Sequence, residues 1–162
     1  MNTQEFFEVK ATTSFGGCTR IYGSVDKEYD LDNPDHLKEL GLANDNKHAD
    51  GYCHFTNCFW MVEERKGANQ VKIALEQIES TVSQLTENKR KVTHTVIIMR
   101  KLSRAEQKRF FVDPKTHELR NKDSARGIRI EGVQETVKVF YHHELSRVIA
   151  ELRGFDWASV SH

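Results

Sequence analysis

The sequence predicts an α/β or α+β fold in which a mixed central β-sheet is flanked by helices. Two strand-like runs stand next to each other, an amphipathic segment follows them, and an apolar strand-like run comes after that. The chain has 162 residues, a length that suits one domain spanning residues 1–162.

The first third of the chain has weaker signals than the rest. The run FFEVKATTSF at 6–15 is compatible with an early strand. The acidic segment DKEYDLDNPD at 26–35 is rich in turn-forming residues. After it, a short helix is predicted to begin at Pro34 and to end at Gly41, because proline suits the first helical turn and glycine suits a helix end.

The runs ADGYCHF (49–55) and CFWMVEERK (58–66) flank Thr56-Asn57 and predict a β-hairpin. If the turn is centred on Asn57, Asp50 lies opposite Glu64, and Lys66 projects from the same face. A turn shifted by one residue would instead bring Glu63 and Arg65 beside Asp50. In the first register the other face carries apolar residues and is expected to be core: Cys53, Phe55, Phe59 and Met61.

Later elements are predicted from periodicity and capping signals. A long helix is expected within 69–88, because apolar residues recur at spacings of four and three; they are Val71, Leu75, Ile78, Val82 and Leu85. The run THTVIIMR (93–100) predicts a central strand. Ser103 and Glu106 indicate a capping box for a short basic helix over 103–111. Strands are expected at 127–132 and 137–143, and a last helix at 143–154.

The charge is unevenly distributed although it sums to zero. Between Lys89 and Arg129 there are thirteen basic and four acidic residues, so this basic segment (89–129) carries thirteen minus four, or nine, excess positive charges. Such a stretch suits a phosphate-rich partner, although a solvated basic surface would look the same. The residues expected to hold a nucleic-acid backbone are Arg100, Lys101, Arg104, Lys108 and Arg109.

The sequence shows no apolar run long enough for a membrane span and no signal peptide. Three cysteines, an odd number, are expected to be free thiols in a reducing cytoplasm. A cytoplasmic protein without membrane contact is therefore predicted.

Asp50, Glu64 and Lys66 form the strongest candidate for a catalytic site. Two carboxylates supply the hard oxygen ligands that Mg²⁺ prefers, and a bound metal ion lowers the pKa of its water. A lysine beside them can hold the attacking water or neutralise a phosphate. These residue types together suit phosphodiester hydrolysis.

Asp50, thirteen intervening residues and then Glu64-Arg65-Lys66 on the second hairpin strand resemble the motif of the PD-(D/E)XK nucleases. The resemblance covers about residues 48–100 and implies a restriction-endonuclease-like core. It implies Asp50 and Glu64 as ligands of Mg²⁺ or Mn²⁺, Lys66 as the catalytic lysine, and cleavage of DNA, or alternatively RNA. It also suggests a supporting glutamine on the next helix, and a further acid from an earlier helix. The candidates for the glutamine are Gln77 and then Gln70. The candidates for the acid are Glu39 or Glu5.

Other sites and functions compete with this hypothesis. Glu8 and Lys10 repeat the E-x-K pattern, but too few residues precede them for an upstream acidic strand. Cysteine and histidine spacing permits a zinc site, although the ligands need not share a face; they are His48, Cys53, His54 and Cys58. His142 and His143 point to opposite faces if they lie on a strand.

The rival function is a non-catalytic interaction domain that binds protein or nucleic acid. With so few residues outside the core, the sequence specificity of such a nuclease is expected to be low or to be supplied by a homodimer or a larger complex.

Overall fold

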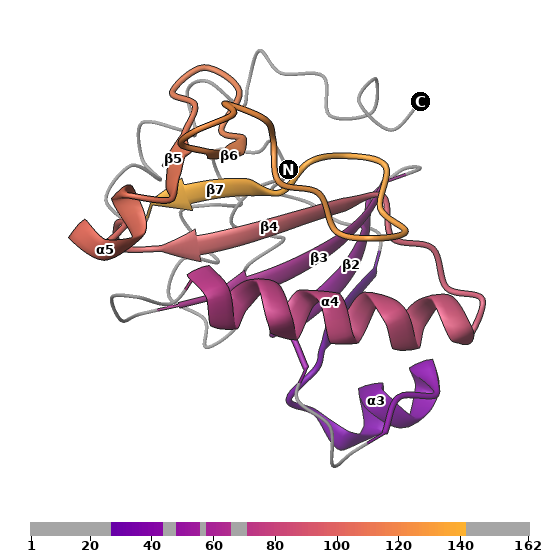
Figure 1. Cartoon of the computed structure of the whole chain (residues 1–162). Coiled ribbons are helices and arrows are strands. Elements are labelled where there is room, and N and C mark those ends of the chain that lie inside the picture. Colours follow the sequence, from indigo (N-terminus) through magenta and orange to yellow (C-terminus); the bar gives the residue numbers. More distant parts are fainter. Residues whose placement is uncertain (1–26, 44–47, 56–57, 66–70, 142–162) are drawn as a thin grey trace.

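We describe a computed structural model of the chain, in which residues 27–43, 48–55, 58–65 and 71–141 are defined. Within these residues the fold is α+β, with a five-stranded mixed sheet of order β1-β2-β3-β4-β7 and a two-stranded sheet, β5-β6 (Figure 1). The strands are β1 Lys27–Asp30, β2 Gly51–Phe55, β3 Cys58–Glu64, β4 His94–Met99, β5 Phe110–Val112, β6 Leu119–Asn121 and β7 Lys138–Tyr141. The helices are α3 Pro34–Leu40, α4 Val71–Glu87 and α5 Arg104–Gln107.

The direction of the strands confirms the predicted mixed sheet. Strands β1, β2 and β3 pair antiparallel, whereas β3 with β4 and β4 with β7 pair parallel. Because two parallel neighbours need a crossover connection, α4 runs back across one face of the sheet between β3 and β4 (Figure 1). The N-terminal end of α4 consequently lies at the edge where β3 and β4 end.

Helix α3 has the ends that the sequence predicts. The Asn33 side chain accepts a hydrogen bond from the backbone N–H of Asp35, and Pro34 follows as the first helical residue. Gly41 ends the helix with φ at 76°. A side chain at this position would be strained by that φ, and its Cβ would stand 2.7 Å from Oδ1 of Asn88 at the end of α4.

The apolar stripe of α4 forms the centre of the main core. Val71, Ile78, Val82 and Leu85 are buried, and Leu75 is partly buried against them, which confirms the predicted face. The helix packs on β3 and β4. Sheet residues that share this core include Met61, Ile97, Met99 and Val139.

Helix α5 keeps its predicted start but is shorter than expected. The capping box of Ser103 and Glu106 is present, yet the helix ends at Gln107. Phe110–Val112 forms β5 instead of a helical turn, because these residues pair with β6. Helical propensity at 103–111 is thus overridden by strand pairing from further along the chain.

The remaining strand predictions are confirmed only in part. The predicted strand at 137–143 is present as β7, but within 127–132 only Gly127 forms an isolated bridge, to Arg120. Strand β1 arises in the acidic segment where turns were expected, because it pairs with β2. The expected strand at 6–15 and helix at 143–154 lie outside the residues that the structure describes.

Cys53 is disulfide-bonded, so the expectation of three free thiols is wrong for this residue. A sulfur held in a disulfide is also no longer available as a thiolate ligand for zinc. In the described part of the chain, no helix combines the length and apolar character needed to cross a bilayer.

Glu106 links α5 to α4. Its carboxylate accepts hydrogen bonds from the backbone N–H of Ser103 at 3.1 Å and from that of Val71, the first residue of α4, at 2.7 Å. One buried side chain therefore satisfies an unpaired donor at each of two helix starts.

Replacing this carboxylate should destabilise the fold. Glu106→Ala leaves both N–H groups without their acceptor, and we expect a loss of about 2–4 kcal/mol in the free energy of unfolding, measured by urea denaturation. Glu79→Ala, which removes an exposed carboxylate from α4, is the matched control and should change stability by less than about 0.5 kcal/mol. Equal effects of the two substitutions would contradict the linking role of Glu106.

Candidate metal and nucleic-acid site

The hairpin register places Glu63, not Glu64, opposite Asp50. The observed pairs include Gly51 with Val62 and Phe55 with Cys58, so paired residue numbers add to 113. The sequence prediction, with a turn centred on Asn57, made them add to 114 and is wrong by one residue. Two residues separate the paired ends of the strands. The centre of the turn therefore falls between two residues and not on Asn57.

The same shift corrects the expected core face of the hairpin. Tyr52 pairs with Met61 and Cys53 pairs with Trp60, so Cys53 and Met61 point to opposite faces of the sheet. Met61 packs in the core beneath α4. Glu63 is two residues further along β3 and therefore projects toward α4 as well.

Glu63 is a buried acid with three hydrogen-bonding neighbours. Its side chain is 1% exposed, and the Arg65 guanidinium donates to its Oε1 at 3.1 Å. When the side-chain amide of Gln77 on α4 is assigned with its nitrogen toward the acid, it donates to Oε1 and Oε2 at 3.0 and 3.1 Å. The backbone N–H of Asp50 also donates to this carboxylate. Strand, neighbouring strand and helix thus converge on one carboxyl group.

Burial raises the pKa of Glu63 from its ordinary 4.5 to about 8. Loss of solvation is the largest cause, and the nearby Asp50 carboxylate raises the pKa further, while Arg65 lowers it. The raised pKa favours the protonated form of Glu63 near neutral pH. Acids with such shifted pKa values, placed beside a second acid, are concentrated at functional sites.

Asp50 is positioned by the segment that precedes β2. The backbone N–H of Ala49 donates to Oγ1 of Thr81 at 2.9 Å, and this hydroxyl donates in turn to the carbonyl of Gln77 at 2.7 Å. The Asp50 carbonyl accepts from the backbone N–H of Leu31 at 3.0 Å. Helix α4 therefore anchors Ala49, the residue before Asp50, and also carries Gln77, whose side-chain amide contacts Glu63.

The structure brings together only part of the predicted site. Asp50 and Gln77 both meet at Glu63. Glu39 lies elsewhere. Its carboxylate is 3.6 Å from Nζ of Lys27, at one end of β1. Asp30, the residue that pairs next to Asp50, is at the other end of β1. The Glu64 side chain is outside the described part of the structure, as are Lys66, Gln70 and Glu5.

The predicted backbone-binding residues gather beyond the end of β4. Arg100 and Lys101 directly follow this strand, Arg104 and Lys108 lie on and just after α5, and Arg109 comes next; all five side chains are exposed. Figure 1 shows α5 at the arrowhead of β4. These cations therefore lie at the same edge of the sheet as the end of β3, which carries Glu63.

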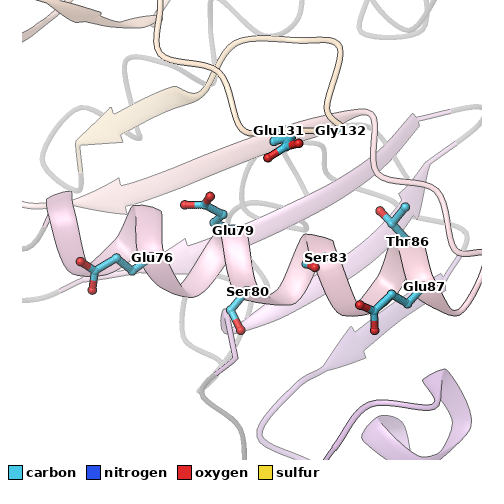
Figure 2. Close-up of a pocket in the computed structure, with 8 residues that line it drawn as sticks. All are labelled: Glu76, Glu79, Ser80, Ser83, Thr86, Glu87, Glu131 and Gly132. Carbon is cyan, nitrogen blue, oxygen red and sulfur yellow. The ribbon is translucent and has the colours of Figure 1, made fainter.

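A hollow along α4 has the opposite charge. It measures about 630 Å³ and lies between α4 and the loop that carries Glu131 and Gly132 (Figure 2). Glu79 points toward that loop, whereas Glu76 and Glu87 spread to either end of the helix face. With four glutamates among its lining residues, this hollow is unsuited to a phosphate-bearing ligand.

The carboxylate oxygens of Glu63 and Asp50 are chemically suitable ligands for a hard cation. Carboxylate oxygens are the ligands that Mg²⁺ and Mn²⁺ prefer, and a buried acid beside a second acid is a group that a cation would ionise. Among the described residues, however, no group of three histidine, cysteine or acidic side chains comes together as a metal cluster. A metal ion here would have the Asp50–Glu63 pair as its protein carboxylates and would complete its shell with water or substrate oxygens.

Comparison of the chain with protein-family models, with curated proteins and with solved structures finds no match. The geometry of Asp50, Glu63, Arg65 and Gln77 is therefore the basis for assigning a function. The sequence pattern indicates Asp50 and Gln77 directly, and Glu63 and Arg65 only in the alternative register. The signal that could have selected that register is the two-residue spacing between the strands.

The raised pKa of Glu63 gives stability a specific pH dependence. Between pH 4.5 and about 8 the unfolded chain has lost this proton and the folded chain keeps it, so the free energy of unfolding falls as the pH rises, by roughly 3–5 kcal/mol in all. Glu63→Gln removes the titration. The stability of this variant relative to the original protein should therefore increase from pH 5 to pH 9 in urea denaturation. Glu79→Gln is the exposed control, and a Glu63→Gln profile parallel to it would refute the shift.

The Thr81 hydroxyl should be needed to hold the start of β2. Thr81→Val keeps the shape of the side chain but leaves the Ala49 N–H buried without its acceptor, at a cost of about 1–3 kcal/mol in the free energy of unfolding. Thr81→Ser keeps the hydroxyl and should preserve most of that stability. Equal losses for serine and valine would show that the methyl group, rather than the hydrogen bonds, matters at this position.

Proposed function

We propose that this protein is a metal-dependent nuclease that hydrolyses phosphodiester bonds in DNA, or alternatively RNA, with Mg²⁺ or Mn²⁺. The observation that carries this proposal is the cross-strand pair of Asp50 and Glu63, with Glu63 buried under α4 and contacted by Gln77. A buried acid with a pKa near 8 lowers the free energy of unfolding once the pH exceeds its ordinary pKa. A role in binding a cation would account for such a destabilising acid at this position.

The order of elements supports the resemblance to the PD-(D/E)XK nucleases. An antiparallel hairpin carries the two acids, an amphipathic helix supplies the glutamine, and an apolar strand follows parallel to the second hairpin strand. On this proposal the five-stranded sheet is a restriction-endonuclease-like core. The acidic position of the motif is Glu63, one residue before the position that the sequence suggested.

Each residue has a distinct part in the proposed reaction. Asp50 and Glu63 would hold the metal ion, which would supply an activated water and neutralise charge on the phosphate. The Glu63 proton must leave when a cation binds, so its high pKa makes metal binding depend on pH. Gln77 donates to the Glu63 carboxylate and would keep it oriented toward Asp50.

Arg65 stands two residues after Glu63, at the position that the motif gives to lysine. Its guanidinium stays charged at all working pH values, so it cannot accept a proton from water. It can hold a phosphate oxygen and balance the negative charge that develops there. The motif lysine proposed from the sequence, Lys66, remains a candidate for the catalytic role beside it.

A non-catalytic interaction domain is the second candidate function, and one contact favours it. Arg65 already pairs with Glu63 at 3.1 Å, so the positive charge near the acid is supplied by the protein itself. On this alternative the pair is a structural contact, and the basic residues beyond β4 bind nucleic acid without cutting it.

Cleavage of supercoiled plasmid and of single-stranded oligonucleotides in Mg²⁺ or Mn²⁺ tests the proposal. Asp50→Asn and Glu63→Gln should each reduce the rate at least about a hundredfold, because each removes a metal ligand. Glu64→Gln is the matched control for Glu63→Gln and should retain most of the activity. Arg65→Ala and Lys66→Ala show which of the two cations acts on the phosphate.

Calorimetric titration with Mg²⁺ or Mn²⁺ at pH 7, in buffers of different ionisation enthalpy, gives an independent readout. Binding should release about one proton in the original protein and none in Glu63→Gln. Cutting that survives both Asp50→Asn and Glu63→Gln would refute the site. No cutting and no metal binding, with nucleic-acid binding retained, would establish the interaction domain instead.

A further inference from the structure

A second cavity, of about 370 Å³, lies next to the basic residues beyond β4. Its volume is in the range of small-molecule sites, about 300–1,000 Å³. Aromatic rings line much of it, and its polar side chains are amides and amines: the rings are Phe110, Phe111 and Tyr141, and the polar groups are Lys101, Gln107 and Lys122. We call it the aromatic cavity.

The walls of the aromatic cavity are fixed by the fold. The Gln107 amide donates to the carbonyl of Leu102 at 3.0 Å, which holds α5 against the chain that leaves β4. The backbone N–H of Lys122 donates to the carbonyl of Arg109 at 2.7 Å. Phe110 and Tyr141 also pack against the main core. The cavity is therefore preformed, which lowers the entropic cost of binding.

Charge and shape together indicate the class of ligand. Two lysines and no acid are among the described lining residues, and Arg100, Arg104 and Lys108 stand exposed nearby. This contrasts with the glutamate-lined hollow along α4. A flat aromatic ring beside cations favours a ligand with a planar face and a negative charge, which a nucleotide combines.

The aromatic cavity and the Asp50–Glu63 pair both adjoin the last residues of β4. Ile98 accepts a hydrogen bond from the backbone N–H of Arg65 at 2.7 Å, and Met99 pairs with Tyr141 of the cavity wall. A strand of nucleic acid held in the cavity would therefore extend along the same sheet edge as the acids.

We infer that the aromatic cavity binds one nucleotide of single-stranded nucleic acid, with its base stacked on Phe111 and its phosphates at Lys101 and Lys122. Phe111 is half-buried and is one of the residues that line the cavity. In a duplex both faces of each base are covered by neighbouring bases, whereas in a single strand they are accessible to an aromatic ring. This inference rests on the proposed function, because it specifies single strands as the substrate.

Binding is measured without metal, in EDTA, by fluorescence anisotropy of a labelled single-stranded oligonucleotide, as DNA and as RNA. The original protein should bind the strand more tightly than a duplex of the same sequence. Phe111→Ala should weaken single-strand binding at least about fivefold. Phe111→Leu, which keeps an apolar side chain without a ring, should weaken it to a similar degree and guards against misfolding of the alanine variant.

The lysines are tested by the salt dependence of binding. Lys101→Gln and Lys122→Gln should each reduce the slope of log affinity against log salt by about 0.7. Lys38→Gln removes an exposed charge from α3, outside the basic segment, and should leave single-strand binding unchanged. An abasic strand should bind weakly and be insensitive to Phe111→Leu.

Equal affinity for abasic and normal strands, or an unchanged affinity in both Phe111 variants, would overturn the stacking of a base. Equal affinity for duplex and single strand would overturn the choice of substrate. These results are separable from a failure of the nuclease proposal. If Phe111-dependent binding persists in EDTA but no cleavage occurs with metal, the nucleotide site is supported and the nuclease proposal is refuted. If cleavage occurs without Phe111-dependent binding, the nuclease proposal is supported and the nucleotide site is refuted.

Discussion

The pairing register of β2 with β3 is the constraint on which the rest of the site depends. Because successive strand residues alternate between faces, a slip of one residue would exchange every side chain beneath α4 for its neighbour. The observed register buries Met61 in the core and sets Glu63 at the end of that face, against Gln77. The same pairing brings Asp50 to the acid across the hairpin.

A buried glutamic acid in this position is an exception to ordinary core packing. Ala74 and Ile78 of α4, close in sequence to Gln77, are fully buried, and an apolar side chain would be the ordinary choice at position 63 beneath this helix. The sequence instead places an acid there and supplies it with donors from Arg65, Gln77 and the Asp50 backbone. Such local departures from a consistent core are expected where a protein gives up stability for function. The proposed metal site and the aromatic cavity then both adjoin the last residues of β4, and the acid-lined hollow runs along α4.

Features coded by neighbouring residues could be predicted closely. Asn33, Pro34 and Gly41 mark the ends of α3, and Ser103 with Glu106 marks the start of α5. The apolar stripe of α4 follows from its helical spacing. Predictions failed where pairing between distant segments decides the structure. Strand β1 forms in an acidic segment because β2 is there to pair with it. Phe110 and Phe111, predicted to be helical, instead join Val112 in pairing with β6.

By itself the sequence determined that a hairpin, an amphipathic helix and an apolar strand follow one another, and that Asp50 and Gln77 belong to the candidate site. Only the tertiary structure decided between Glu63 and Glu64, removed Glu39 from the site, and showed that Thr81 anchors Ala49. The physical reason is that capping and helical periodicity are read within one turn of chain, whereas strand register and burial depend on which distant segments pack together.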